Sequence, residues 1–459
     1  MKYLSKVVIL LLLHPLMAYN QDYIIKGKIN DLPDQKIYFS SFHGDKNIKI
    51  DTITTSKEGS FEYHIPSKLP TGMYRINMLF DQKFELILNG ENIVFETSFN
   101  DPSGKMVISE SEENAVYYNF LQLDNNLQLK LELLTPIIDF YPDDDDFFKK
   151  SQRHYEEMQE TYSKKVEHLI MEHNHTLASR IAMIARTPRL PASLKTEQRM
   201  DYLKAHFFDH TDFTDSALIK SNAYINKAID YLTLYANPNF TKEQLEKQYI
   251  KAIDIILSYA VVCNEVYDFL LEYFVNGFEK YNFELVLDHI SLNYSPSNKC
   301  ENKERKSQLE KRLESYQKLV RGNKVPEIIS KDQERNPIIL SELKSNYTLV
   351  VFWATWCPHC KSLLPEIKKS CDILSADEIK ILAVSLDTLQ NDWLSFIKSF
   401  TGNWVHCSDL KGWNSKAADD YSIYATPTMF LLDINKKILA KPVTYNELYA
   451  ALRENGILK

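Results

Sequence analysis

Two cysteines separated by two residues, Cys357 and Cys360, carry the clearest chemical signal in this 459-residue sequence. They follow the apolar run 348–353, which has the composition of a buried strand, and precede the helical pattern 361–370. A strand–helix junction places the first sulfur at the helix N-terminus, where unpaired backbone N–H groups and the helix dipole stabilise a thiolate. Since only the thiolate attacks a disulfide, the pattern predicts a redox-active cysteine pair.

The residues beside the pair fit the same chemistry. Pro358 has no backbone N–H and suits the first turn of a helix. His359 offers a positive charge or a donor next to the sulfur, and cysteine pKa values at such sites fall to about 3.5–7.5 from about 8.5. Trp356 adjoins the first cysteine and is expected to shape the surface on which a substrate docks. These residues and the two cysteines are the candidate site.

The elements that must position the pair alternate between strands and helices over residues 322–459. Apolar composition, periodicity and turn signals predict the strand 348–353, a helix 361–370 kinked by Pro365, the strand 379–387, a helix 391–400, the hairpin 428–433 and 437–441, and a closing helix 445–453. This order, β-α-β followed by β-β-α, is that of a thioredoxin fold.

The string 352–360 (FWATWCPHC) and the lead-in 325–328 (VPEI) resemble the TlpA/ResA-like family of exported thioredoxin-fold oxidoreductases. The resemblance covers only this last domain. It implies that Cys357 attacks a substrate disulfide and that Cys360 resolves the mixed disulfide, with oxidation of substrates as the same path reversed.

The resemblance also assigns a role to Thr426 and Pro427, which precede the strand 428–433. It implies a cis peptide bond beside the sulfurs, where the backbone of Thr426 pairs with a bound peptide as an added strand. The implied partners are proteins with thiols or disulfides and a membrane thiol donor of the DsbD type. No organic cofactor or metal is expected.

Two departures from the family leave the direction of electron flow open. The Pro-His dipeptide between the cysteines is that of the strongly oxidising DsbA type. Val351 and Leu363 stand where relatives carry a buried acid, so Lys361 or Glu366 are the candidate proton acceptors.

The leading function is reduction or exchange of protein disulfides. The alternatives are a DsbA-like disulfide oxidase or isomerase, and a binding or scaffold protein with an auxiliary thioredoxin domain. A peroxiredoxin-like activity is disfavoured because its P-x-x-x-T/S-x-x-C pattern is absent.

Four other cysteines give no second redox motif. A zinc site is disfavoured because Cys371, His406 and Cys407 do not form a second pair of ligands at suitable spacing. Packing is the expected role of Cys371 and Cys407, although a bond between them or a relay stays open. Cys263 is expected to be a buried core thiol, and a Cys263–Cys300 bridge is the alternative.

The chain before the redox domain divides into three segments. Residues 1–18 combine two lysines with the apolar run VVILLLL and predict a signal peptide, hence export to the periplasm or cell envelope. Short alternating strands over 19–110 predict an all-β sandwich, and helical periodicity over 111–321 predicts an all-α domain. With the α/β thioredoxin fold of 322–459 the chain is multidomain, and no later stretch is apolar enough to span a membrane.

The β-segment carries two local signals. Gly27 suggests a bulge or bend in the strand 23–29, and Asn89-Gly90 is a hairpin signal between strands 84–88 and 92–97. The segment resembles the β-domain that precedes thioredoxin domains in many bacterial envelope proteins, which implies architecture rather than chemistry.

The α-segment reads as separate helices whose limits are set by proline. Runs with helical spacing cover residues 114–134, 146–174, 216–236 and 241–275, and Pro136 is expected to lie between helices. Thr241 and Gln244 have the spacing of a capping box. Part of this segment, from 175 onward, resembles a helical domain paired with thioredoxin domains in bacterial envelope proteins.

The remaining polar and aromatic signals favour structural roles. The net charge of −8 disfavours a nucleic-acid partner. His173 and His175 would face different sides of a helix and are expected at the surface or in caps rather than as metal ligands. The acidic run 143–146 is expected to begin a helix rather than bind calcium. Trp404 and Trp413 are expected to pack the domain.

Overall fold

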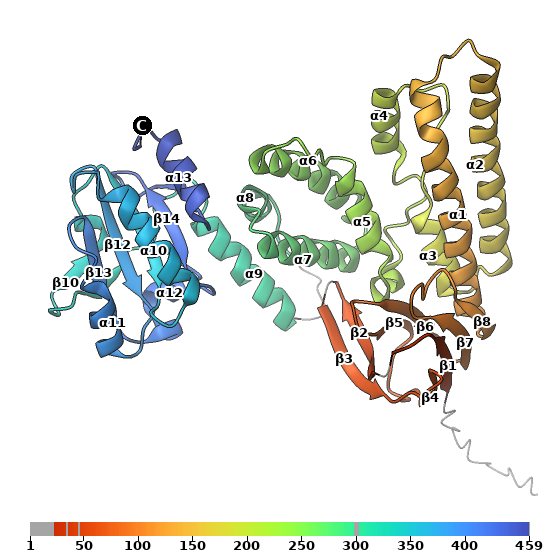
Figure 1. Cartoon of the computed structure of the whole chain (residues 1–459), viewed down its shortest axis with the longest axis horizontal. Helices are drawn as coiled ribbons and strands as arrows, with labels where there is room; N and C mark the ends of the chain where they lie inside the picture. The colour runs from red at the N-terminus through yellow and green to blue at the C-terminus, as the bar shows by residue number, and fades with distance from the viewer. Residues whose placement is uncertain (1–22, 34, 45, 298–302, 459) are drawn as a thin grey trace, which may run out of the picture. The chain divides into compact units, whose positions relative to one another are not determined.

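The computed structural model describes residues 23–458 except 34, 45 and 298–302. The expected signal peptide, residues 1–18, lies outside the described residues. The chain forms two compact units, 1–227 and 228–459 (Figure 1). Within the described residues, no helix is both long and apolar enough to cross a membrane.

The first unit begins with two four-stranded sheets, in the orders β4-β1-β7-β8 and β3-β2-β5-β6. Apolar side chains alternate with polar ones along β1, β4 and β7, so that one side of each strand faces a shared core. This confirms the all-β N-terminal fold. The strands are β1 (Ile24–Asn30), β2 (Ile37–His43), β3 (Lys46–Ile53), β4 (Ser60–His64), β5 (Gly72–Asn77), β6 (Lys83–Leu88), β7 (Ile93–Ser98) and β8 (Val107–Glu110).

Two glycine expectations in this region need correction. Gly27 pairs regularly with Phe61 on β4 and Phe95 on β7, without a bulge, and a Cβ there would lie 2.5 and 2.6 Å from their rings. Glycine is therefore required by the crossing of two aromatic side chains. Gly90 has the expected positive φ of 71°, but β6 and β7 belong to different sheets, so the turn joins the sheets instead of closing a hairpin.

The helices of the first unit are α1 (Glu112–Phe140), α2 (Asp146–Glu172), α3 (Leu177–Ala185) and α4 (Thr196–His206), with a 3-10 turn at Ser216–Lys220. Pro136 lies inside α1, so the expectation that it separates helices was wrong. Asp145 caps α2 by accepting the N–H of Phe147 at 2.6 Å, which confirms the helix-start role of the acidic run.

His173 and His175 are brought together rather than separated. Nδ1 of His173 and Nε2 of His175 hydrogen-bond the carboxylate of Glu112, the first residue of α1, at 2.7 and 3.1 Å. The expectation of different helix faces failed because His173 is the C-cap of α2 and His175 lies beyond its end. These contacts connect the segment after α2 to the N-terminus of α1. Among the described residues no group of three or more His, Cys, Asp or Glu could hold a metal ion.

The second unit contains α6 (Lys242–Ala260), α7 (Asn264–Lys280), α8 (Glu284–Asn293) and α9 (Lys303–Lys318), and α5 (Ala223–Thr233) covers the residues where the two units meet in sequence. Thr241 and Gln244 form the expected capping box of α6. The run 241–275 is two helices. Cys263 is the N-cap of α7, half-buried, with its thiol 3.1 Å from Glu265 Oε2, so it is not a core thiol. Cys300 lies outside the described residues.

The C-terminal domain is built on a five-stranded sheet in the order β13-β12-β11-β14-β15 (Figure 1). Its central strand β11 (Tyr347–Trp353) pairs parallel with β12 (Ile379–Ser385) and antiparallel with β14 (Thr428–Leu432). The other elements are β9 (Ile329–Lys331), β10 (Pro337–Ile339), β13 (Trp404–Cys407), β15 (Ile438–Ala440), α10 (Pro358–Cys371), α11 (Gln390–Ile397), α12 (Lys416–Asp420) and α13 (Tyr445–Glu454). The multidomain class with a C-terminal thioredoxin fold is confirmed.

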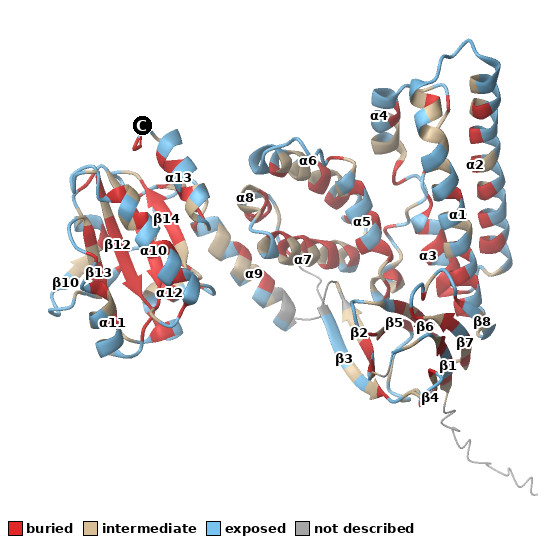
Figure 2. Ribbon diagram, in the orientation of Figure 1, coloured by how far each residue is buried: buried red, intermediate tan, exposed pale blue. Residues whose placement is uncertain are grey.

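Apolar cores cover both faces of this sheet, and its central strand β11 is buried from Thr348 to Trp353 (Figure 2). One core contains Leu349, Val351 and Trp353 with α10, α11 and α13, and the other contains the alternate residues Val350 and Phe352. The remaining cysteines of the domain are buried free thiols on opposite faces: residue 371 belongs to the first core and residue 407 to the second. This arrangement supports packing as their role and places the sheet between them.

Candidate active site

The buried strand β11 delivers the chain to the N-terminus of α10, and Cys357 is the N-cap of that helix. Its Sγ accepts the Cys360 backbone N–H at 3.4 Å and lies 3.2 Å from the carbonyl oxygen of Thr426, to which the thiol donates. The Thr426–Pro427 peptide bond is cis, as expected. Residues far apart in the sequence, 357 and 426, thus meet at one sulfur.

The two thiols differ in both exposure and acidity. Cys357 is 5% exposed and Cys360 is fully buried. Burial acts to raise the pKa of Cys357, but hydrogen bonds with the Thr426 side chain, with the thiol and backbone of Cys360 and with the His359 backbone outweigh it, so its pKa lies below the ordinary value. Burial raises the pKa of Cys360 to about 12. Near neutral pH the first sulfur is therefore much the better nucleophile.

Pro358 and His359 occupy the first turn of α10, where both are exposed. The backbone N–H of His359 hydrogen-bonds the Cys357 sulfur and helps to lower its pKa. The sequence led us to expect either a positive charge or a donor from His359. The structure has the donor, and it is the main-chain N–H of His359.

The proton acceptors considered from the sequence do not reach the pair. Val351 and Leu363 are buried apolar residues of the core, as their types require. Lys361 and Glu366 are exposed, whereas the Cys360 side chain is fully buried beneath the same helix. Both candidate substitutes are therefore placed wrongly for taking a proton from this thiol.

Asp387, which sequence reasoning missed as a site residue, anchors the loop that precedes the cysteines. Its carboxylate is buried and accepts the Thr355 N–H at 3.0 and 3.2 Å, the Thr355 hydroxyl at 2.6 Å and the Ser385 hydroxyl at 2.7 Å. Thr355 is two residues before Cys357. The sequence signal was an acid two residues after the end of a largely buried strand, which is a common position for functional residues in α/β folds.

Trp356 is half-exposed, as a docking residue should be, and a second tryptophan joins it. The rings of Trp356 and Trp413 lie 5.8 Å apart, and Trp413 is 46% exposed. The expectation that Trp413 packs the domain was therefore wrong, whereas Trp404 is buried in the core. An aromatic pair of this kind provides apolar contact area beside the reactive sulfur.

Residues 321–441 match the model of the AhpC/TSA family, a match that contains both cysteines and the cis-proline loop. Thiol-disulfide oxidoreductase ResA of a Bacillus cereus strain is 27% identical over 125 residues, which cover 27% of this chain and 70% of that protein. ResA of Bacillus subtilis (strain 168) is 26% identical over 118 residues, 26% of this chain and 64% of that protein. The C-terminal domain is a ResA-like thioredoxin domain.

The ResA-like domain accounts for the last part of the chain, and its enzyme class is that of the thiol–disulfide oxidoreductases, as the sequence predicted. Residues 23–117 and 149–285 match two families described as domains of unknown function, DUF4369 and DUF5106. A thioredoxin-like protein from Bacteroides caccae (ATCC 43185) aligns over 59% of this chain and 98% of its own, with 20% identity and a TM-score of 0.44.

Proposed function

We propose that this protein is an exported enzyme that reduces or exchanges disulfides in other proteins through Cys357 and Cys360. The observation that carries the proposal is the unequal pair of thiols at the start of α10, one with a lowered and one with a raised pKa, beside a cis-proline loop. This difference in pKa suits a mechanism in which Cys357 attacks the substrate first and Cys360 stays protonated until it resolves the mixed disulfide.

In the reducing direction, the Cys357 thiolate attacks one sulfur of a substrate disulfide. A new S–S bond joins Cys357 to that sulfur, and the other substrate sulfur leaves as a thiolate that takes up a proton. Cys360 then loses its proton and attacks Cys357 Sγ, which releases the second substrate thiol and leaves the Cys357–Cys360 disulfide. Two electrons pass to the substrate, so a thiol donor, for which we propose a DsbD-like membrane protein, must restore the pair.

The substrate is proposed to lie along the cis-proline loop. The backbone of Thr426 would pair with an extended segment of the substrate, because its carbonyl already faces the reactive sulfur. Trp356 and Trp413 would cover the apolar part of the same segment. The periplasm or cell envelope is the proposed compartment, on the strength of the N-terminal 1–18 pattern.

The redox equilibrium of the mature protein against glutathione tests this function. We expect a two-electron couple with a potential near or below about −220 mV, which would make the protein a reductase dependent on a donor. The couple should vanish in Cys357→Ser and persist in Cys263→Ser, a matched control at a half-exposed cysteine outside the domain core. A potential near about −120 mV would mean that the enzyme oxidises its substrates. Absence of any couple dependent on Cys357 would refute the proposal.

A further inference from the structure

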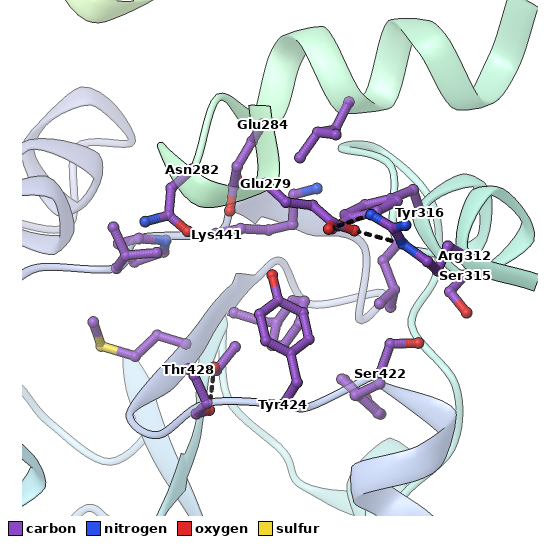
Figure 3. Close-up of a pocket in the computed structure, with 18 of the residues that line it drawn as sticks. Glu279, Asn282, Glu284, Arg312, Ser315, Tyr316, Ser422, Tyr424, Thr428 and Lys441 are labelled. Carbon is purple, nitrogen blue, oxygen red and sulfur yellow. Dashed lines mark hydrogen bonds and ion pairs between the residues drawn. The ribbon is translucent and has the colours of Figure 1, made fainter. Parts of the chain in front are cut away.

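A cavity of about 550 Å³ lies against the cis-proline loop, within the second unit (Figure 3). Its walls come from the end of α7, the start of α8, α9, the segment 421–430 and the segment 441–443. A volume of this size accommodates a large side chain or a small ligand. No part of the reaction described above uses it.

A single residue, Thr426, separates two residues of the cavity wall and contacts the reactive sulfur. Ala425 and Pro427 line the cavity, whereas the residue between them, Thr426, hydrogen-bonds Cys357 instead. In an extended substrate peptide, successive side chains point to opposite sides. A peptide that pairs with this loop and turns its cysteine to Cys357 would therefore turn the neighbouring residue toward the cavity.

Several charged groups of the cavity wall are paired with one another or with a neighbouring residue. Glu279 accepts from Arg312 Nε at 3.1 Å and from the Tyr316 hydroxyl at 2.7 Å, and Lys441 donates to Asp288 at 2.8 Å. A ligand therefore gains little by competing for Glu279 or Lys441. The other charged residues of the wall are Glu284 and Lys311, one of each sign.

Glu284 is the lining residue, among those that the structure describes, with a buried polar atom left unpaired. Its Oε2 is shielded from solvent and has no hydrogen-bond partner among the described residues. Burial raises the pKa of Glu284 to about 7, an effect that Lys441 and Arg321 only partly offset. Its carboxyl group and the Tyr424 hydroxyl point into the same space from opposite walls (Figure 3). An unpartnered buried acceptor is costly, so a ligand that brings a donor is favoured over one that brings an acid.

We propose that this cavity is a specificity pocket that takes the lysine or arginine side chain of a residue next to the reactive cysteine of the substrate polypeptide. The inference rests on the proposed thiol–disulfide exchange and assigns its substrate class. The aliphatic stem would lie along Leu319 and the ring of Tyr424, and the charged end would donate to Glu284.

Peptides carrying one cysteine as a mixed disulfide with thionitrobenzoate provide the test. Attack by Cys357 on the peptide sulfur releases the coloured thiol, and the residue beside the cysteine is varied among arginine, leucine and glutamate. We expect kcat/KM for arginine to exceed that for leucine by about tenfold, since a charge-assisted hydrogen bond is worth about that much. Glutamate should be the poorest.

The variants separate the pocket from the redox pair. Glu284→Gln should bring the arginine-to-leucine ratio close to one by lowering kcat/KM for the arginine peptide. Tyr424→Ala, at an exposed ring, should lower the ratio without affecting folding. Glu454→Gln, an exposed glutamate on α13, should change nothing. A wild-type ratio near one, or a ratio that survives Glu284→Gln, would overturn the pocket while thiol release still depended on Cys357. Release independent of Cys357 would overturn the proposed function as well. Glu284-dependent binding of free arginine amide without a peptide preference would mark a small-molecule site and overturn this inference.

Discussion

Asp387 is the position at which a single change tests how the active-site loop is held. Its carboxylate accepts from three donors, the Thr355 N–H, the Thr355 hydroxyl and the Ser385 hydroxyl, all in a buried environment. Asp387→Asn keeps the shape and one carbonyl oxygen but replaces the other oxygen by an amide donor. At least one hydrogen bond and the charge that strengthened the others are lost.

The expected cost follows from those contacts. Hydrogen bonds to a charged group contribute about 1.5–3 kcal/mol, so we expect the free energy of unfolding to fall by about 2 kcal/mol. For a unit of this size, that corresponds to a decrease of roughly 4–8 °C in Tm. Because Thr355 is two residues from Cys357, loosening the loop should also weaken the hydrogen bonds on the sulfur and move the Cys357 pKa back toward its ordinary value.

Two measurements on the reduced protein test whether Asp387 anchors the loop. Thermal unfolding followed by tryptophan fluorescence gives the stability change, and the pH dependence of Cys357 alkylation gives its pKa. Asp392→Asn is the matched control, the same substitution at an exposed position of α11. If Asp387→Asn were as stable as this control to within about 0.5 kcal/mol, the anchoring role would be refuted. Lower stability with an unchanged Cys357 pKa would limit Asp387 to a structural role.

Three other predictions concern acidity and packing. In the reduced protein, the rate at which iodoacetamide modifies Cys357 should reach half its maximum at a lower pH than for an ordinary thiol. Cys360, whose pKa is raised to about 12, should stay unmodified at neutral pH. Equal labelling of the two cysteines, measured by peptide mapping, would contradict the difference between their pKa values. Because the pKa of Glu284 is raised from 4.5 to about 7 in the folded state, the folded protein holds that proton more tightly, and its free energy of unfolding falls as the pH rises through this interval. Between pH 5 and 8, the free energy of unfolding of Glu284→Gln in urea should therefore rise relative to that of the wild type. A difference between the two proteins that does not change with pH would contradict this prediction. Gly27→Ala should destabilise the β-domain by about 1–3 kcal/mol because its Cβ meets two phenyl rings, whereas Gly277→Ala, in a helix with open space around it, should stabilise by about 0.5–1 kcal/mol.

Local pattern was sufficient for much of the fold. The buried strand, the Cys-x-x-Cys pair and the helix that follows are set by composition and by residues within a few positions of one another, and the structure has them as β11, Cys357 and α10. The capping box at Thr241 and Gln244 is likewise a contact between near neighbours. Where proline was expected to end a helix, at Pro136, the helix continues to Phe140, because the packing of α1 against α2 and α3 outweighs the hydrogen bond that proline cannot make.

The partners of the redox site were decided only by the tertiary structure. Asp387 reaches Thr355 because β12 lies beside β11, and Trp413 reaches Trp356 across the same end of the sheet. The cavity at Glu284 forms where the helices preceding the domain meet the cis-proline loop of the domain itself. The periodicity of the sequence does not predict these contacts, because they depend on which strands pair and which helices pack. The sequence alone therefore located the reactive sulfur, and the fold determined what surrounds it.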